Sequence, residues 1–120
     1  MTKRNTSPRD PLATNFRTLQ RALAAVRLAR PLLARLKGRN KEIASQLDRA
    51  LVRCTLAIGE AMRREGGNRQ VRFRQARGEA HEALVALMTA EAAGVAKRED
   101  LEELASELDL LIGCLVRLTR

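Results

Sequence analysis

Six arginines crowd a short stretch in the middle of the chain, and guanidinium groups at this density bind anions. The six are Arg63, Arg64, Arg69, Arg72, Arg74 and Arg77. They flank Gly66-Gly67-Asn68, in which glycine permits the positive φ of a tight turn. Four of them follow the turn and crowd the start of an expected helix, where positive charge opposes the helix dipole and favours a bound phosphate. The alternative is a solvated tip that Glu60 and Glu65 neutralise in part.

Other side chains that could catalyse a reaction or bind a metal are few, and their spacing does not suit either role. His81 lacks a nucleophile or carboxylate partner that the spacing would hold beside it, as a catalytic base requires. The segment Glu79-Ala80-His81-Glu82 does not have the Glu-x-x-His spacing of metal sites in helical bundles. Cys54 and Cys114 fall on or beside apolar stripes and are expected to be reduced core thiols. We therefore expect a non-enzymatic protein without metal or cofactor.

Two long helices between Asn40 and Gly94 must position these arginines. On the first arm, small or apolar residues recur at alternating spacings of four and three: Ile43, Leu47, Ala50, Cys54, Ala57 and Ala61. The second arm repeats the pattern with Phe73, Ala76, Ala80, Ala83 or Leu84, Leu87 and Ala90. This period keeps each set on one helix face. Asn40 should cap the first arm and Asn68 the second, so the sequence predicts a helical hairpin.

A helix on each side of the hairpin completes the expected fold. The first begins between Asp10-Pro11 and Asn15, continues through a kink at Pro31 and closes near Gly38. Its expected inner face is Phe16, Leu19, Leu23, Val26, Ala29, Leu33 and Leu36. The last begins near Lys97, with the inner face Leu101, Leu104, Leu108, Leu111, Leu115 and Leu118. Together the four helices predict an all-α, up-down-up-down bundle over residues 12–120, after a flexible basic tail at residues 1–11.

The charge of the chain is unevenly distributed. The 120 residues suit one domain, and their net charge of +9 comes from 23 basic and 14 acidic residues. Residues 1–41 hold eleven of the basic residues and one acid, whereas residues 83–120 hold four basic and seven acidic residues. No apolar stretch approaches the roughly 20 residues that span a bilayer, and no signal-type run opens the chain. We expect a cytoplasmic protein.

The apolar surface is wider than one bundle core requires. The surplus residues are Leu51, Val52, Leu56, Ile58, Val85, Met88, Leu110, Ile112 and Val116. Some of them must face outward if only one seam is buried, and an exposed apolar patch of this size marks an interface. We expect a homo-oligomer, with a broad core in a monomer as the alternative.

The order of residues around the turn resembles the four-helix-bundle family of proteins encoded in 23S rRNA intervening sequences. The matching segments are Gln46-Leu47-Asp48-Arg49-Ala50, Leu56-Ala57-Ile58-Gly59-Glu60-Ala61, Asn68-Arg69, Arg72-Phe73 and Ala76-Arg77-Gly78-Glu79-Ala80-His81-Glu82. The resemblance covers roughly Leu19 to Leu118. The chain departs from the family at Ala57, Ala61 and Glu79, which replace the usual Asn, Gly and Ser.

This resemblance implies a four-helix bundle that assembles as a ring-like homopentamer without a catalytic site. A related bundle is the accessory protein of diversity-generating retroelements, a basic pentamer that binds nucleic acid and its reverse transcriptase. The resemblance therefore implies RNA or DNA, and a nucleic-acid enzyme such as a reverse transcriptase, as partners.

The functional prediction is a non-enzymatic oligomeric bundle that binds nucleic acid through phosphates, with the turn arginines, Arg17 and Arg21 as contacts. Because the chain has no Trp or Tyr, binding by base stacking is disfavoured and salt dependence should be strong. The alternative is a protein–protein scaffold, and a membrane-surface helix is weaker still, because the bundle occupies its apolar face. The scaffold gains if the acidic last helix neutralises the first-helix arginines, which are Arg17, Arg21, Arg27 and Arg35.

Overall fold

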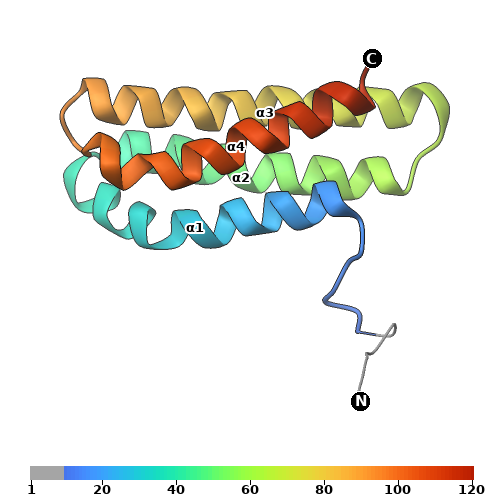
Figure 1. Cartoon of the computed structure of the whole chain (residues 1–120), viewed down its shortest axis with the longest axis horizontal. Helices are drawn as coiled ribbons and strands as arrows, with labels where there is room; N and C mark the ends of the chain where they lie inside the picture. The colour runs from blue at the N-terminus through green and yellow to red at the C-terminus, as the bar shows by residue number, and fades with distance from the viewer. Residues whose placement is uncertain (1–9) are drawn as a thin grey trace.

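The structure, a computed structural model, describes residues 10–120, which form four helices and no strand. The helices are α1 (Arg17–Arg39), α2 (Lys41–Met62), α3 (Gly66–Ala92) and α4 (Arg98–Leu118). Each packs against two others, α1 and α3 both lying between α2 and α4, and the contact of α2 with α3 is the most extensive. Figure 1 shows the α2–α3 turn at the end of the molecule where α1 begins and α4 finishes. The all-α prediction is confirmed, while residues 1–9 of the predicted tail lie outside the described residues.

Local signals set the two outer ends of the hairpin as predicted. The Asn40 side chain caps α2 by accepting a hydrogen bond from the Ile43 N–H at 3.0 Å. After α3, Gly94 adopts a φ of +73°. There the Val95 N–H donates to the Ala90 carbonyl at 3.0 Å and the Gly94 N–H to the Glu91 carbonyl at 3.0 Å. This pair of bonds is the Schellman motif, which explains why α3 stops where it does.

The predicted capping role of Asn68 is wrong. Gly66 takes a φ of +57° and turns the chain at once, so α3 already begins at Gly66 and Asn68 lies inside its first turn. Glu65 occupies the N-cap position without a side-chain hydrogen bond to the helix. The start of α3 is therefore uncapped by any side chain.

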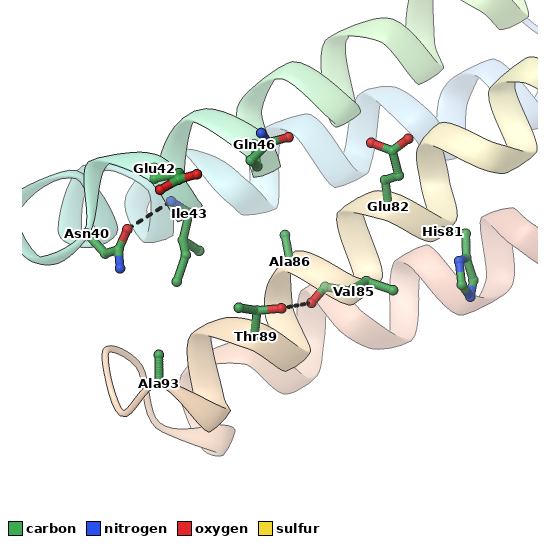
Figure 2. A pocket seen from close by; sticks show the side chains of 10 residues that line it. All are labelled: Asn40, Glu42, Ile43, Gln46, His81, Glu82, Val85, Ala86, Thr89 and Ala93. Carbon is green, nitrogen blue, oxygen red and sulfur yellow. Dashed lines mark hydrogen bonds between the residues drawn. The ribbon is translucent and has the colours of Figure 1, made fainter.

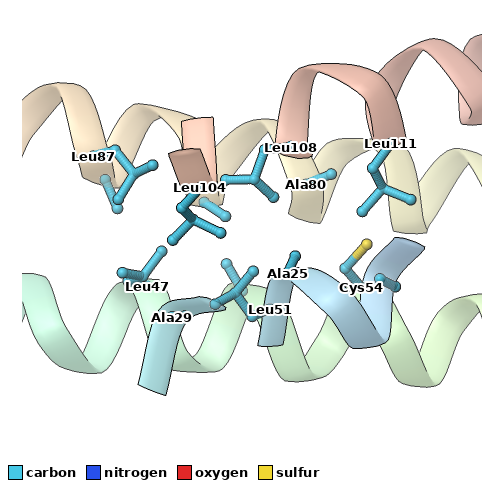
Figure 3. Close-up of a cluster of buried hydrophobic side chains, with 14 of the residues drawn as sticks. Ala25, Ala29, Leu47, Leu51, Cys54, Ala80, Leu87, Leu104, Leu108 and Leu111 are labelled. Carbon is cyan, nitrogen blue, oxygen red and sulfur yellow. The ribbon is translucent and has the colours of Figure 1, made fainter. Parts of the chain in front are cut away.

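The predicted inner faces of α2, α3 and α4 are confirmed. Every residue predicted to face inward on these helices is buried, apart from Leu84 and Leu118, which are half-buried. Figure 3 shows leucines of α2, α3 and α4 meeting alanines of α1 and α3 in the centre. Both cysteines are free and buried, as expected for core thiols.

The predicted inner face of α1 is confirmed at Ala29 and Leu36 and is shifted by one residue at Leu19, Leu23, Val26 and Leu33. The structure buries Thr18, Ala22, Ala25, Ala29, Leu32 and Leu36. Leu19, Leu23, Val26 and Leu33 are only half-buried. Alanines have short side chains, so α1 can approach α2 and α4 closely when this row faces inward. The larger side chains then lie on the flank of the helix.

The start of α1 also differs from the prediction, because neither Asp10 nor Asn15 caps it. The helix begins at Arg17, after Thr14 Oγ1 has accepted a hydrogen bond from the Phe16 N–H at 3.1 Å. Asp10 instead closes a small turn by accepting from the Leu12 N–H at 3.0 Å. The helix does continue through Pro31, which lies exposed on its outer side.

Candidate nucleic-acid interface

The end of the bundle that holds the α2–α3 turn, called the tip from here on, collects arginines from all four helices or their ends. The Phe16 and Phe73 rings lie 6.2 Å apart between centroids, which joins the start of α1 to α3. The Gln70 amide donates to the Leu118 carbonyl at 2.9 Å, which joins the end of α4 to α3. The ten arginines of the tip are Arg17, Arg21, Arg63, Arg64, Arg69, Arg72, Arg74, Arg77, Arg117 and Arg120.

Two of the predicted contact residues hold the turn itself together. Arg69 donates to the Ala61 carbonyl at 3.3 Å, and its guanidinium lies 5.0 Å from the centroid of the Phe73 ring. The Arg72 Nε lies 3.3 Å from a carboxylate oxygen of Glu60. Glu60 therefore pairs with Arg72 across the turn, and both guanidinium groups are partly occupied by the protein.

Two more predicted contact residues are anchored to α4. Arg77 donates to Thr119 Oγ1 at 2.9 Å. The Arg21 guanidinium donates to Glu107 at 3.2 Å, and both side chains are about three-quarters buried. These contacts hold the guanidinium group of Arg21 in α1 and that of Arg77 in α3 against α4 and the residue that follows it.

The other four predicted contact residues are exposed. They are Arg17, Arg63, Arg64 and Arg74. Within residues 10–120 the structure gives none of these side chains an ion pair or hydrogen bond. Their guanidinium groups can therefore contact an external anion without breaking a contact of the fold.

Backbone donors lie among these arginines. The first turn of α3 has neither a side-chain cap nor an acidic residue. Counting from the start of α3 at Gly66, the first backbone N–H that donates to a carbonyl is that of Arg69, which donates to Glu65 at 3.4 Å. The N–H groups of Gly66, Gly67 and Asn68 thus stand at the positive end of the helix dipole, where a phosphate oxygen would be stabilised.

The acidic α4 neutralises little of the basic surface of α1. Of the four first-helix arginines in question, only Arg21 has a carboxylate partner among the described residues. Arg17, Arg27 and Arg35 remain exposed. Neutralisation of these arginines by α4 would favour a scaffold over a nucleic-acid binder. Among the described residues it is seen for Arg21 and not for the other three.

Cys54, His81 and Glu82 are among the remaining side chains considered for chemistry from the sequence. Burial, and secondarily the nearby Glu79 carboxylate, raises the pKa of Cys54 to about 12, so its thiol is protonated at neutral pH. Figure 2 shows His81 and Glu82 pointing away from one another in the groove between α2 and α3. Over residues 10–120 no three His, Cys, Asp or Glu side chains come close enough to hold a metal ion. None of the helices in this range is long and apolar enough to cross a bilayer.

The comparisons with known proteins describe the fold. No family model and no curated protein match the chain. A crystal structure of a protein of unknown function from the S23 ribosomal protein family of Bacteroides thetaiotaomicron is similar, with a TM-score of 0.77 and 20% sequence identity. The alignment covers 86% of this chain and 98% of that one. At this identity the likeness shows a shared helical fold, extending over nearly all of the solved protein.

Proposed function

We propose that this protein is a non-enzymatic, homo-oligomeric four-helix bundle that binds nucleic acid without sequence specificity through its phosphates. The observation that carries the proposal is the tip, where four exposed arginines without partners among the described residues lie at the same end of the bundle as the uncapped start of α3 (Figure 1). Guanidinium groups bind phosphate oxygens with paired hydrogen bonds, and open helix N-termini bind the same oxygens.

The aromatic residues favour backbone contacts over base reading. Phe73 is 1% exposed and Phe16 is half-buried against it, so neither ring offers a free face for stacking. Contacts to phosphate alone give binding that weakens steeply with salt. If Arg17, Arg63, Arg64 and Arg74 each neutralise one phosphate, the slope of log K against log salt is about −3.6 per subunit on duplex DNA.

The assembly and its partners follow from two kinds of likeness. The fold is similar to a solved member of the S23 ribosomal protein family, and the residues around the turn resemble the intervening-sequence proteins. Both support an up-down-up-down bundle, and the second supports a ring-like homopentamer. By the same resemblance we propose that its partners include RNA or DNA and a nucleic-acid enzyme such as a reverse transcriptase. We also propose that the protein is cytoplasmic.

The test is fluorescence anisotropy with labelled duplex DNA, single-stranded DNA and structured RNA over a series of salt concentrations. A variant with Arg63→Gln, Arg64→Gln and Arg74→Gln should bind at least about tenfold more weakly, with a salt slope smaller by about three. The matched control removes three exposed charges at the other end of the bundle, with Arg35→Gln, Lys41→Gln and Lys97→Gln. It should retain most of the affinity. No binding by the unaltered protein at low salt would refute the proposal.

The alternative, a protein–protein scaffold, has one observation in its favour. The groove between α2 and α3 has a volume of about 550 Å³ and is lined by apolar residues such as Ile43, Val85 and Ala86 (Figure 2). Val85 is 41% exposed there. A chain that binds no nucleic acid, but binds a helical peptide partner that a Val85→Glu variant loses, would favour the scaffold.

A further inference from the structure

Two helices carry a second apolar row beside the row that they bury. On α1, one residue after each buried position, the row reads Leu19, Leu23, Val26, Arg30, Leu33 and Lys37. On α4, again one residue after each buried position, it reads Glu102, Ala105, Asp109, Ile112 and Val116. Both rows have the alternating three and four spacing of a helix–helix seam. We call them the α1 row and the α4 row.

Both rows lie at the surface. All four large apolar residues of the α1 row are half-buried, and Leu23 lies outside the residues that pack on the core. In the α4 row, Ala105 and Ile112 are half-buried and Val116 is 38% exposed. Leu19, Val26, Leu33, Ala105 and Ile112 rest partly on the chain's own core. Each of these side chains keeps an exposed part, and rows with a period this regular can cover a further helix.

The two rows face opposite sides of the bundle. Leu33 and Lys37 line a groove of about 540 Å³ between α1 and α2. Glu102 and Ala105 line a groove of about 390 Å³ between α3 and α4. Because α1 packs on α2 and α4, and α3 packs on the same two helices, the α1–α2 side lies opposite the α3–α4 side. One chain can therefore offer each row to a different neighbour.

The rows have opposite charge at matching positions. Arg30 and Lys37 are seven residues apart on the α1 row, and Glu102 and Asp109 are seven residues apart on the α4 row. When the two rows are set antiparallel, Lys37 meets Glu102 and Arg30 meets Asp109. The same alignment sets Leu33 on Ala105, Val26 on Ile112 and Leu23 on Val116, and leaves Leu19 beyond the end of the α4 row. A parallel alignment keeps the two charge pairs but leaves Leu19, Leu23 and Val26 without a partner in the row.

We propose that the α1 row of one copy packs antiparallel on the α4 row of a second copy of this chain. The occupant is a second copy because the chain itself carries both complementary rows. This inference rests on the self-association included in the proposed function and names the faces that make it. The contact is heterologous, so each copy leaves one row free for the next and the contact repeats around an assembly.

The direction of the contact places the tips together. Within a chain, α1 begins and α4 ends at the tip, while Arg39 at the end of α1 donates to Val95 just before α4 at the other end, at 3.1 Å. Helices α1 and α4 of one chain are therefore antiparallel. An antiparallel contact between α1 of one copy and α4 of the next gives all copies the same direction. The exposed arginines of every tip then lie on one face of the assembly, where they can follow one nucleic-acid backbone.

Charge reversal followed by light scattering tests this pairing. Variant one carries Glu102→Lys and Asp109→Lys, and variant two carries Arg30→Glu and Lys37→Glu. Each alone should reduce the assembly to single chains, because like charges then meet across the contact. A chain with all four reversals should assemble again, because opposite charges then meet across every contact. The matched control reverses Glu103 and Arg35, exposed residues outside both rows, and should keep the full mass.

The outcomes separate this inference from the proposed function. Circular dichroism establishes that each variant is folded. A single-chain mass for the unaltered protein at about 100 µM would overturn self-association altogether, since assembly depends on protomer concentration. If variants one and two keep the oligomeric mass, the pairing of these faces is wrong. The same holds if the four reversals together fail to restore the oligomer. Either result leaves self-association itself standing. Binding of a short duplex by the single-chain variants reports separately on the tip, because they keep all its arginines.

Discussion

At the end of the bundle opposite the tip, called the base here, acids offset the basic side chains. Residues 35–42 and 91–103 carry six basic and six acidic residues. The tip has ten arginines, and Glu60 and Glu65 are the acids of its turn. Both ends are rich in positive side chains, so the two ends differ in local net charge because of where the acidic residues lie. Two acids in the first turn of α4 and one in that of α2 stabilise helix starts at the base, whereas the first turn of α3 at the tip has none.

The two ends are also closed in different ways. At the base, Asn40 caps α2, a Schellman motif ends α3, and Arg98 forms two hydrogen bonds with Glu91, at 2.8 and 3.1 Å. At the tip, the buried Phe73 ring and the side chain of Arg69 take over this role. The base is thus held by local backbone and charge contacts, and the tip by packing. Four arginines of the tip stay without a partner among residues 10–120, namely Arg17, Arg63, Arg64 and Arg74, and can contact a ligand.

Phe73→Ala should have the largest effect on stability, because the tip depends on that ring. A buried phenylalanine truncated to alanine costs about 3–5 kcal/mol of unfolding free energy, and Phe73 is 1% exposed. Urea denaturation followed by circular dichroism measures the loss. Phe16→Ala is the control, since Phe16 is half-buried and its loss should be clearly smaller. Equal losses for the two variants would contradict the account of the tip.

Asn40→Ala and Asn68→Ala compare the helix starts at the two ends. Asn40 caps α2, and removal of such a cap costs about 1 kcal/mol. Asn68 makes no cap, so its replacement should change the unfolding free energy by less than about 0.5 kcal/mol. Thermal and urea unfolding of both variants check the difference. An equal loss of unfolding free energy for the two variants would contradict the structure, in which the Asn68 side chain does not cap α3.

Glu79→Gln should have the smallest effect, and it depends on pH. Partial burial, and then repulsion from Glu82, raises the pKa of Glu79, while Arg53 lowers it in part. A carboxyl with a raised folded pKa contributes stability that is present below its unfolded pKa and lost as pH rises through the folded value. The glutamine variant should therefore gain stability relative to the unaltered protein between about pH 4 and pH 7. Urea midpoints across that range measure the gain.

Glu82→Gln provides the control for this titration. It removes the second cause of the shift and leaves the first, so its gain over the same pH range should have the same sign and a smaller size. A Glu79→Gln variant that loses stability as pH rises would contradict the direction of the shift.

Much of the fold could be predicted because three helices each carry a single dominant apolar row. The rows of α2, α3 and α4 were predicted at their true positions from spacing alone. On α1 two adjacent rows fit the same period, and spacing favours the one with larger side chains. The structure buries Ala22 and Ala25 in place of Leu23 and Val26, because close approach of neighbouring helices decides which row fits. Which row is buried depends on the helices that pack against α1, and the sequence of α1 by itself carries no information about them.

The candidate site could be predicted in part. The turn arginines are neighbours in the sequence, so their clustering follows from the hairpin. Their meeting with Arg17 and Arg21 needs the contact of Phe16 with Phe73, which is tertiary. Which arginines are free is decided by single contacts such as Arg77 with Thr119, across 42 residues of sequence. Residue type and spacing do not distinguish Arg77 from Arg74.

Amide chemical shifts of the isotope-labelled protein, measured as a short DNA duplex is added, test the central claim most directly. The Gly66, Gly67 and Asn68 amides at the tip should shift, and these shifts should disappear at high salt as phosphate contacts weaken. The amides of Gly94 and Val95 at the base should stay in place. Shifts at the base without shifts at the tip would contradict the claim that the tip binds nucleic acid.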